Sequence, residues 1–372
     1  MSRKNASQFS ASDLLQKIDF EEIDGFAADD LAAAFDAFRR SAKIVAADAR
    51  EQRSAVPPPQ TLISAANAAL EGVEDPARFF RRWFQPRRIK AKGFVTAYYE
   101  VEVEARLSPA PGFVTAVLSR PLDLVTLNEA PLALLSGERL TSARRQADGA
   151  LVPYPDRRAI EEEGAAPSAH PIAYVRDPVE LFLIQVQGSA RLRLPDGGVM
   201  ALTYAGRNGW PYTSVGRLMI ERGLVKPADM SLDLMKETLR RLGAGPGEAG
   251  RRIMQENRSY VFFEIDRSEA RAIGPIGGQG APLTPFRSIA VDRSIWCYGL
   301  PFWVAARLPW RSEAETEFRR LMIAQDTGSA IIGPARADLF FGAGEAAGRR
   351  AGDIRHAAEM VVLLPKDAGD GP

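Results

Sequence analysis

The chain of 372 residues predicts a mainly β fold that also contains α-helices. Three patterns support this class: apolar residues at helical spacing before residue 84, alternating apolar and polar residues from Phe94, and short apolar runs separated by turns after residue 260. The length suggests two domains. A composition with 46% hydrophobic residues supplies enough apolar side chains for a core.

Three helices are predicted before the first strand. Leu31, Phe35 and Phe38 recur at near-helical spacing, a run of prolines then interrupts the chain, and Asp75 before a proline marks the start of the last helix. We expect these helices to serve packing. They span residues 29–50, 62–70 and 76–83.

From Phe94 the side chains alternate, with Tyr99 on one side and Tyr98 opposite, which predicts a strand over residues 94–104. Further strands are expected at residues 182–187, 191–194, 288–291, 301–305, 320–325 and 360–364. Further helices are expected at residues 213–223, 231–242 and 246–257, and the tail 366–372 is expected to be disordered.

The composition argues against several classes of function. The net charge of +1 leaves no basic excess for a nucleic-acid partner. A single cysteine, Cys297, excludes an intramolecular disulfide, and its aromatic neighbours favour a buried apolar role. Two histidines, His170 and His356, are too few and too far apart for a metal site, and we expect no cofactor. No apolar run is long enough to span a bilayer.

Three aspartates lie in apolar segments punctuated by glycine. Asp326 begins Asp-Thr-Gly-Ser-Ala-Ile, Asp338 lies in Ala-Asp-Leu-Phe-Phe-Gly, and Asp292 lies in Val-Asp-Arg-Ser-Ile. Taken singly, each aspartate more often closes a turn, because its side chain bonds the backbone two residues on. Together they favour chemistry, because burial raises a carboxyl pKa until the group holds a proton near neutral pH. Cleavage of a glycosidic bond requires such an acid.

These segments resemble the three-aspartate domain of the membrane-bound lytic murein transglycosylase A family. Two further blocks resemble the same family: residues 96–100, and residues 185–189 followed by 204–212. The resemblance extends from about residue 94 to 352 and implies a double-psi β-barrel into which a second β-rich domain is inserted. The barrel with its N-terminal helices would take residues 1–104 and 261–372, and the insert residues 105–260.

The resemblance also implies catalytic roles. By its place in the motif, Asp338 corresponds to the family's single catalytic acid, which would protonate the oxygen leaving N-acetylmuramic acid while the C6 hydroxyl of that sugar attacks C1. Because this attack occurs within one sugar, no second catalytic carboxylate is needed, and the product is a 1,6-anhydromuramyl end. We count Asp326 with Asp338 among the catalytic residues, and Asp292 among the substrate contacts. Both would orient substrate hydroxyls or tune the pKa of Asp338. Either one would otherwise close a turn.

Glycan strands of peptidoglycan are the expected partner. Tyr98 and Tyr99 offer rings on which sugars stack, and strand alternation would let only one of them face the groove. The other expected contacts are Gln187, Gly188, Ser189, Tyr204 and Asn208. Ordinary strand packing and turn capping are the alternative for each of these residues.

Two other functions remain open: a hydrolytic glycosidase that uses Asp326 and Asp338 as a carboxylate pair, and a non-catalytic glycan-binding protein. The resemblance implies the periplasm or outer membrane of a Gram-negative cell envelope, although neither a signal peptide nor a lipid-anchor cysteine is visible near Met1. Oligomeric state, wall-synthesis partners, and action at chain ends or internally are left open.

Overall fold

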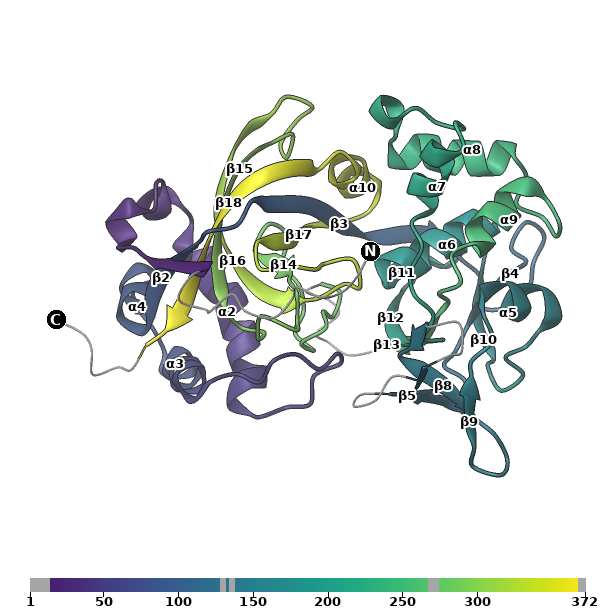
Figure 1. Ribbon diagram of the computed structural model, residues 1–372, viewed down its shortest axis with the longest axis horizontal. Coiled ribbons are helices and arrows are strands. Elements are labelled where there is room, and N and C mark those ends of the chain that lie inside the picture. The colour runs from purple at the N-terminus through teal and green to yellow at the C-terminus, as the bar shows by residue number, and fades with distance from the viewer. Residues whose placement is uncertain (1–13, 128–131, 134–137, 267–273, 367–372) are drawn as a thin grey trace. The chain divides into compact units, whose positions relative to one another are not determined.

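The computed structural model describes residues 14–127, 132–133, 138–266 and 274–366, so the expected disorder after residue 366 lies outside the described residues. The chain divides into two compact units, which are treated one at a time (Figure 1). Unit 1 comprises Met1–Tyr98, Ala272–Gly342 and Asp353–Pro372, and unit 2 comprises Tyr99–Arg271 and Ala343–Gly352. The limits expected for an insert, residues 105 and 260, stay a prediction.

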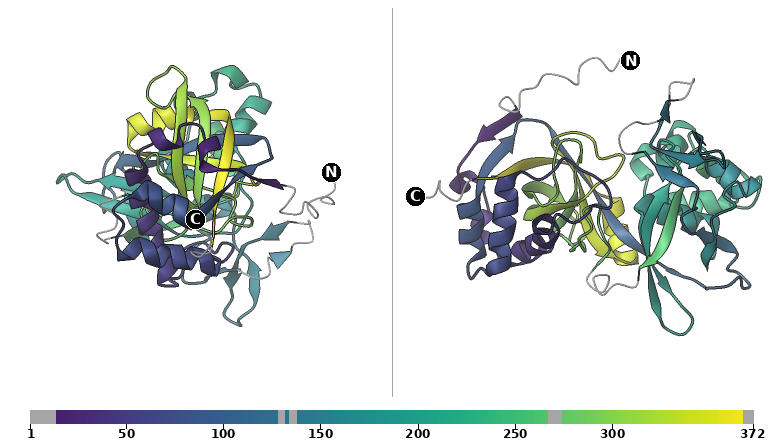
Figure 2. Two further views of the ribbon diagram at one scale, coloured as in Figure 1. Left: turned by 90° about the vertical axis from the view of Figure 1, so that its left-hand side faces the viewer. Right: turned by 90° about the horizontal axis from the view of Figure 1, so that it is seen from below.

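Unit 1 contains the three expected N-terminal helices. Asp30 and Asp75 cap two of them, each accepting an amide hydrogen bond from the first helical turn. The helices are α2 (Leu31–Ala46), α3 (Gln60–Glu71) and α4 (Pro76–Trp83), preceded by the short 3₁₀ helices η1 (Phe20–Glu22) and η2 (Phe26–Ala28). Figure 2 shows them stacked beside the strands of unit 1.

Buried aromatic side chains hold these helices together. Phe35 and Phe38 of α2 contact Phe79 and Phe80 of α4 at centroid distances between 4.9 and 6.3 Å. Pairs of this kind add about 0.5–1.5 kcal/mol each beyond the burial of their area. Helix α2 thus packs against α4 through this cluster, and it also packs against strand β16 (Thr316–Asp326).

The strands of unit 1 close into a six-stranded barrel built from both ends of the chain. Around the ring these are β3 (Gly93–Glu104), β18 (Arg355–Pro365), β15 (Pro301–Leu308), β16, β14 (Ser288–Ala290) and β17 (Arg336–Ala343), which pairs with β3 again. Strands β2 (Phe84–Ile89) and β1 (Leu15–Lys17) extend the sheet beyond β18. The barrel, with helices before it and another unit within the chain, confirms the expected fold class.

Gly93 permits the closure between β3 and β18. A Cβ atom there would lie 2.2 Å from the carbonyl oxygen of Ala358, a distance that no side chain tolerates. Beyond Tyr98, strand β3 continues into unit 2, where it pairs in parallel with β11 (Ser189–Arg193).

Unit 2 combines a small sheet with a helical cluster. Strand β11 is followed in the sheet by β12 (Val199–Arg207) and β13 (Val261–Asp266). Phe182, Met219 and Leu239 belong to one buried core shared by α6 (Pro178–Gln187), α7 (Val215–Glu221), α8 (Leu232–Arg241) and α9 (Ala249–Gln255). The remaining elements are β4 (Thr115–Leu118), β5 (Leu124–Thr126), β6 (Leu132–Ala133), β7 (Arg139–Leu140), β8 (Ser142–Arg145), β9 (Leu151–Pro153), α5 (Arg157–Glu163), β10 (Pro171–Val175), η3 (Pro227–Asp229) and α10 (Glu345–Gly352).

The strand expected at residues 182–187 is wrong, because helix α6 occupies that segment. Asp177 caps the helix, Pro178 takes its first position, and Gly188 ends it in the left-handed conformation with φ 82°. A short run of buried apolar residues has no periodicity that separates a strand from a helix.

In the described parts of the chain, no helix is both long and apolar enough to cross a membrane.

Candidate active site

Asp338 lies on barrel strand β17, opposite Ala290 of β14. The side chains that follow it, Leu339 and Phe340, are buried. Burial raises the pKa of Asp338 from 3.8 to about 6, although a hydrogen bond from Thr96 and the charge of Arg336 lower it; the charge of Asp326 raises it further. The carboxyl therefore exchanges its proton close to the pH at which a general acid is most effective.

Asp326 lies at the end of strand β16 and accepts three hydrogen bonds. Its Oδ1 accepts hydrogen bonds from the amides of Gly278 and Thr327, both at 2.8 Å. Its Oδ2 accepts one from the hydroxyl of Tyr98 at 2.9 Å. With three donors on two oxygens, the Asp326 side chain is held in place near Asp338.

The adjacent tyrosines of β3 have different surroundings. The Tyr98 ring contacts Phe340 at 5.3 Å, and burial together with the charges of Asp326 and Asp338 raises the pKa of its hydroxyl well above the usual value. Tyr98 therefore remains a hydrogen-bond donor. Tyr99 belongs to unit 2, where it is buried against Gly348, at which a Cβ would lie 2.7 Å from the ring.

Asp292 is buried, closes one turn and bonds a second loop. Its Oδ1 accepts from the amide and the hydroxyl of Ser294 at 3.0 and 2.6 Å, and its Oδ2 accepts from the amide of Gly333 at 2.8 Å. The side chain thus ties the segment after β14 to the loop before β17. The turn-closing alternative describes these contacts, and a role in orienting substrate stays a prediction.

Four of the expected glycan contacts lie in unit 2 on half-buried residues. Gln187 and Gly188 end helix α6, Ser189 begins β11, and Tyr204 lies on β12. The Oε1 of Gln187 accepts the amide of Tyr99 at 3.4 Å, which places these two expected contacts side by side. Their binding of a glycan stays a prediction.

Asn208 is held by hydrogen bonds within unit 2. It is fully buried, its Nδ2 donates to the carbonyl oxygens of Pro155 and Arg258 at 2.9 Å each, and its Oδ1 accepts from the amide of Tyr260 at 2.9 Å. These bonds engage both amide hydrogens and the oxygen within unit 2. Binding of a glycan by Asn208 stays a prediction.

Thr96 contacts the candidate acid and Arg336 contacts Thr96, but neither was among the expected site residues. Thr96 Oγ1 lies 2.5 Å from Oδ1 of Asp338, and Nη2 of Arg336 donates to the same Oγ1 at 2.7 Å. Each precedes an expected site residue by two positions on one strand: Thr96 precedes Tyr98, and Arg336 precedes Asp338. Strand periodicity, which brings such pairs to one face, was the available signal.

The glycine-rich segment at residues 274–280 wraps around the end of β16. A Cβ at Gly277 would lie 2.4 Å from the Gln325 carbonyl oxygen, and a Cβ at Gly278 would lie 2.7 Å from the Tyr298 hydroxyl. Glycine is needed there because the backbone approaches closely enough for an amide to reach Asp326.

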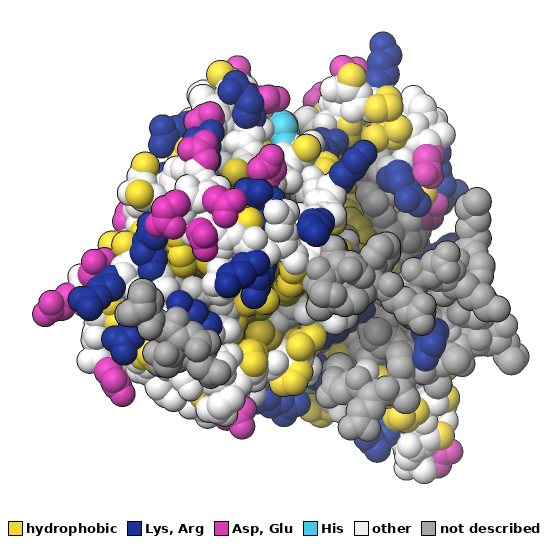
Figure 3. All heavy atoms as spheres, turned by 60° about the vertical axis from the view of Figure 1, so that its left-hand side comes forward, with side chains coloured by type: hydrophobic (Ala, Val, Ile, Leu, Met, Phe, Trp, Pro, Cys, Tyr) yellow, Lys and Arg dark blue, Asp and Glu magenta, His cyan; other side chains and the backbone are white. Residues whose placement is uncertain are grey.

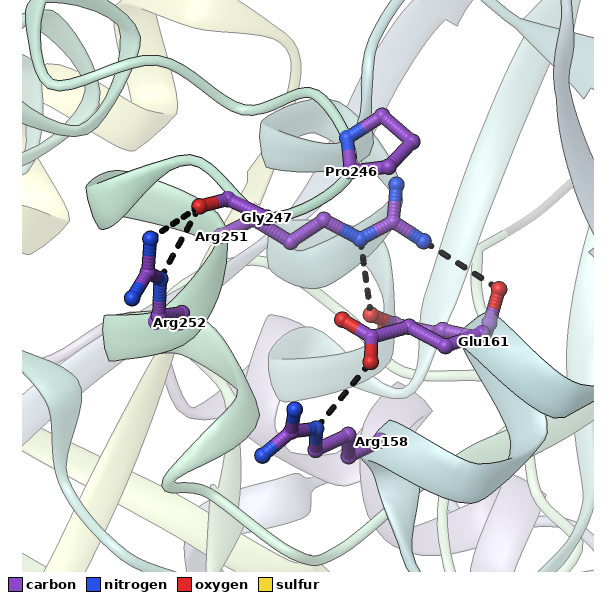
Figure 4. Close-up of a pocket in the computed structure, with 7 residues that line it drawn as sticks. Arg158, Glu161, Pro246, Gly247, Arg251 and Arg252 are labelled. Carbon is purple, nitrogen blue, oxygen red and sulfur yellow. Dashed lines mark hydrogen bonds and ion pairs between the residues drawn. The ribbon is translucent and has the colours of Figure 1, made fainter.

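Charges of opposite sign compensate one another elsewhere on the molecule. A pocket of about 400 Å³ within unit 2 pairs Arg158 with Glu162 at 3.0 Å and Arg251 with Glu161 at 3.6 Å (Figure 4). None of the expected site residues lines this pocket. Side chains of both signs also mix on the face in Figure 3, in keeping with the net charge of +1.

Comparison with known families agrees with this fold. The family model described as the MltA specific insert domain matches residues 94–264, and that described as the 3D domain matches residues 287–364. The chain is similar to the crystal structure of membrane-bound lytic murein transglycosylase from Agrobacterium tumefaciens, with 34% identity, a TM-score of 0.82, and coverage of 95% of this chain and 98% of that chain. For MltA from Neisseria gonorrhoeae the values are 28%, 0.76, 94% and 92%.

A curated relative, membrane-bound lytic murein transglycosylase A of Vibrio cholerae, is 34% identical over 198 residues, or 52% of this chain and 51% of the relative. The match therefore spans about half the length of that relative. Both matched regions and the near-complete structural coverage identify the same family. The chain belongs to the membrane-bound lytic murein transglycosylase A family.

Proposed function

We propose that this protein is a lytic transglycosylase that cleaves the β-1,4 bond between N-acetylmuramic acid and N-acetylglucosamine in peptidoglycan. The observation that carries the proposal is Asp338, a carboxyl whose surroundings raise its pKa to about 6. Its proton passes to the glycosidic oxygen as the bond from C1 breaks. The C6 hydroxyl of the muramic acid then bonds to C1 and returns its proton to Asp338, which leaves a 1,6-anhydro ring.

The contacts of Asp326 favour this reaction over hydrolysis by a carboxylate pair. A hydrolase needs its second carboxylate free to attack C1 or to activate water. Three donors already occupy the oxygens of Asp326. We assign Asp326 to electrostatic support, because its negative charge holds the proton on Asp338 and stabilises positive charge that develops at C1.

The proposed glycan contacts fall in both units. Tyr98 presents its ring beside the acid in unit 1, and Asp292 shapes the loop before β17. In unit 2 the proposed contacts are Tyr99, Gln187, Gly188, Ser189, Tyr204 and Asn208. We further propose that residues 1–104 with 261–372 form the three-aspartate domain and residues 105–260 its insert. The proposed location is the periplasm or outer membrane of a Gram-negative cell envelope.

The products of purified sacculi test the activity. Wild type should release muropeptides with 1,6-anhydromuramyl ends, detected by mass spectrometry, and Asp338→Asn should release none while still sedimenting with sacculi. Asp36→Asn, on an exposed face of α2, is the matched control and should match wild type. Reducing muramyl ends would show a hydrolase. Binding without any cleavage by wild type would show a glycan-binding protein.

A further inference from the structure

Three side chains in unit 1 form a short relay that ends at the acid. Arg336 and Asp338 lie two residues apart on β17, and Thr96 lies on the neighbouring strand β3. Arg336 Nη2 donates to Thr96 Oγ1 at 2.7 Å, and the same oxygen lies 2.5 Å from Oδ1 of Asp338. The guanidinium is itself held, since it stacks over Phe94 at 5.4 Å and its Nη1 donates to the carbonyl oxygen of Ala337.

The direction of the hydrogen bonds in this relay is determined by chemistry. A guanidinium has donors only, so Thr96 Oγ1 must accept from Arg336. A hydroxyl has one hydrogen, and the Thr96 hydrogen is then free to point to Oδ1 of Asp338. When the carboxyl is protonated, Oδ1 is already an acceptor, and the acid proton resides on Oδ2.

The other oxygen of Asp338 is the one a ligand can reach. Among the described residues, Oδ2 of Asp338 has no hydrogen-bonding partner. It is also not among the polar side-chain atoms that are closed to solvent and lack a partner, so solvent can reach it. The charged or titratable groups around the carboxyl are Arg336 on its own strand, Asp326 at the end of β16 and Tyr98 on β3. The paired strand β14 (Ser288–Ala290) contributes none.

We propose that Arg336 and Thr96 are positioning residues that direct the acid proton to the open oxygen of Asp338, from which it is delivered to the glycosidic bond. This inference rests on the proposed lytic activity. Without Arg336, the Thr96 hydroxyl becomes free to accept, and the protonated carboxyl can donate from Oδ1 to Thr96. Thr96 then holds the proton on Oδ1, away from the substrate.

Two substitutions and their combination test the relay. Thr96→Val removes the hydroxyl but keeps its shape, so the proton divides between two equivalent oxygens, and the rate at low pH should fall about twofold by that statistical factor. Arg336→Met leaves a competing acceptor, and a neutral hydrogen bond of ordinary strength lowers the rate about five- to tenfold. Adding Thr96→Val to Arg336→Met removes the competing acceptor, so the double variant should be faster than Arg336→Met alone.

The measurement is the initial rate of anhydromuropeptide release between pH 4.5 and 8. Both single variants should also move the basic limb of the pH profile upward, because each removes an interaction that lowers the pKa of Asp338. Thr96→Ser, which keeps the hydroxyl, should rescue the position of that limb. A double variant as slow as or slower than Arg336→Met would overturn the relay.

Infrared difference spectra of wild type against Asp338→Asn at pH 4.5 supply a readout that needs no activity. The carbonyl stretch of protonated Asp338 should rise in frequency on Thr96→Val, because the carbonyl oxygen loses its donor. An unchanged band would overturn the relay even if wild type were inactive. Wild type without anhydro products, but with the expected band shift, would instead refute the proposed activity and leave the relay intact.

Discussion

Replacing Asp338 by Asn should abolish lysis and, at neutral pH, stabilise the folded protein. The carboxyl keeps its proton up to about pH 6 in the folded state, against a usual pKa of 3.8. Above pH 6 the folded state thus carries a half-buried negative charge that water solvates better in the unfolded chain. At 1.36 kcal/mol per pKa unit this shift costs up to about 3 kcal/mol, and asparagine, neutral at every pH, removes the cost.

The stability difference between Asp338→Asn and wild type should depend on pH. The advantage of Asp338→Asn over wild type should be fully present at pH 8, decrease as pH falls from 6 toward 4, and vanish below, where both proteins are neutral at this position. Urea denaturation of wild type, Asp338→Asn and the control Asp36→Asn at pH 4 and 8 measures it, because other titrations cancel in the difference. An equal difference at both pH values would refute the burial of this carboxyl.

Three further outcomes are expected. Asp29→Ala strips the buried Arg287 guanidinium of a two-pronged carboxylate partner and should cost about 3–5 kcal/mol in chemical denaturation, so a loss under 1 kcal/mol would contradict the buried pair. Gly93→Ala pushes a Cβ against a carbonyl of β18 and should lower stability by about 1–3 kcal/mol; an unchanged melting curve would argue against the tight closure. Tyr98→Phe should leave the fold intact but slow anhydromuropeptide release about tenfold through loss of its bond to Asp326, and a wild-type rate would remove that bond from the mechanism.

Much of unit 1 was predictable from local pattern. Helices α2, α3 and α4 follow from apolar spacing and from caps such as Asp75, and β3 follows from alternation. These signals lie within a few residues of one another along the chain. Helix α6 was not predictable in the same way, since a buried apolar run suits either structure.

The candidate site was likewise predictable only in part. The chain by itself determined that Asp326 and Asp338 stand in apolar, glycine-punctuated segments, and resemblance to a family assigned the acid. It did not reveal that the Asn208 amide bonds the carbonyl oxygens of Pro155 and Arg258, because an amide that bonds a glycan and one that bonds distant carbonyls look alike in sequence.

Only the tertiary structure decided which groups surround the acid. Thr96 and Asp338 are separated by 242 positions, and Tyr98 and Asp326 by 228, and barrel closure brings each pair into hydrogen-bond contact. A carboxyl pKa depends on burial and on charges within a few ångströms, so it is a property of that closure. Residue type and order specify the strands and the acid, whereas pairing between remote strands decides the protonation state that the chemistry requires.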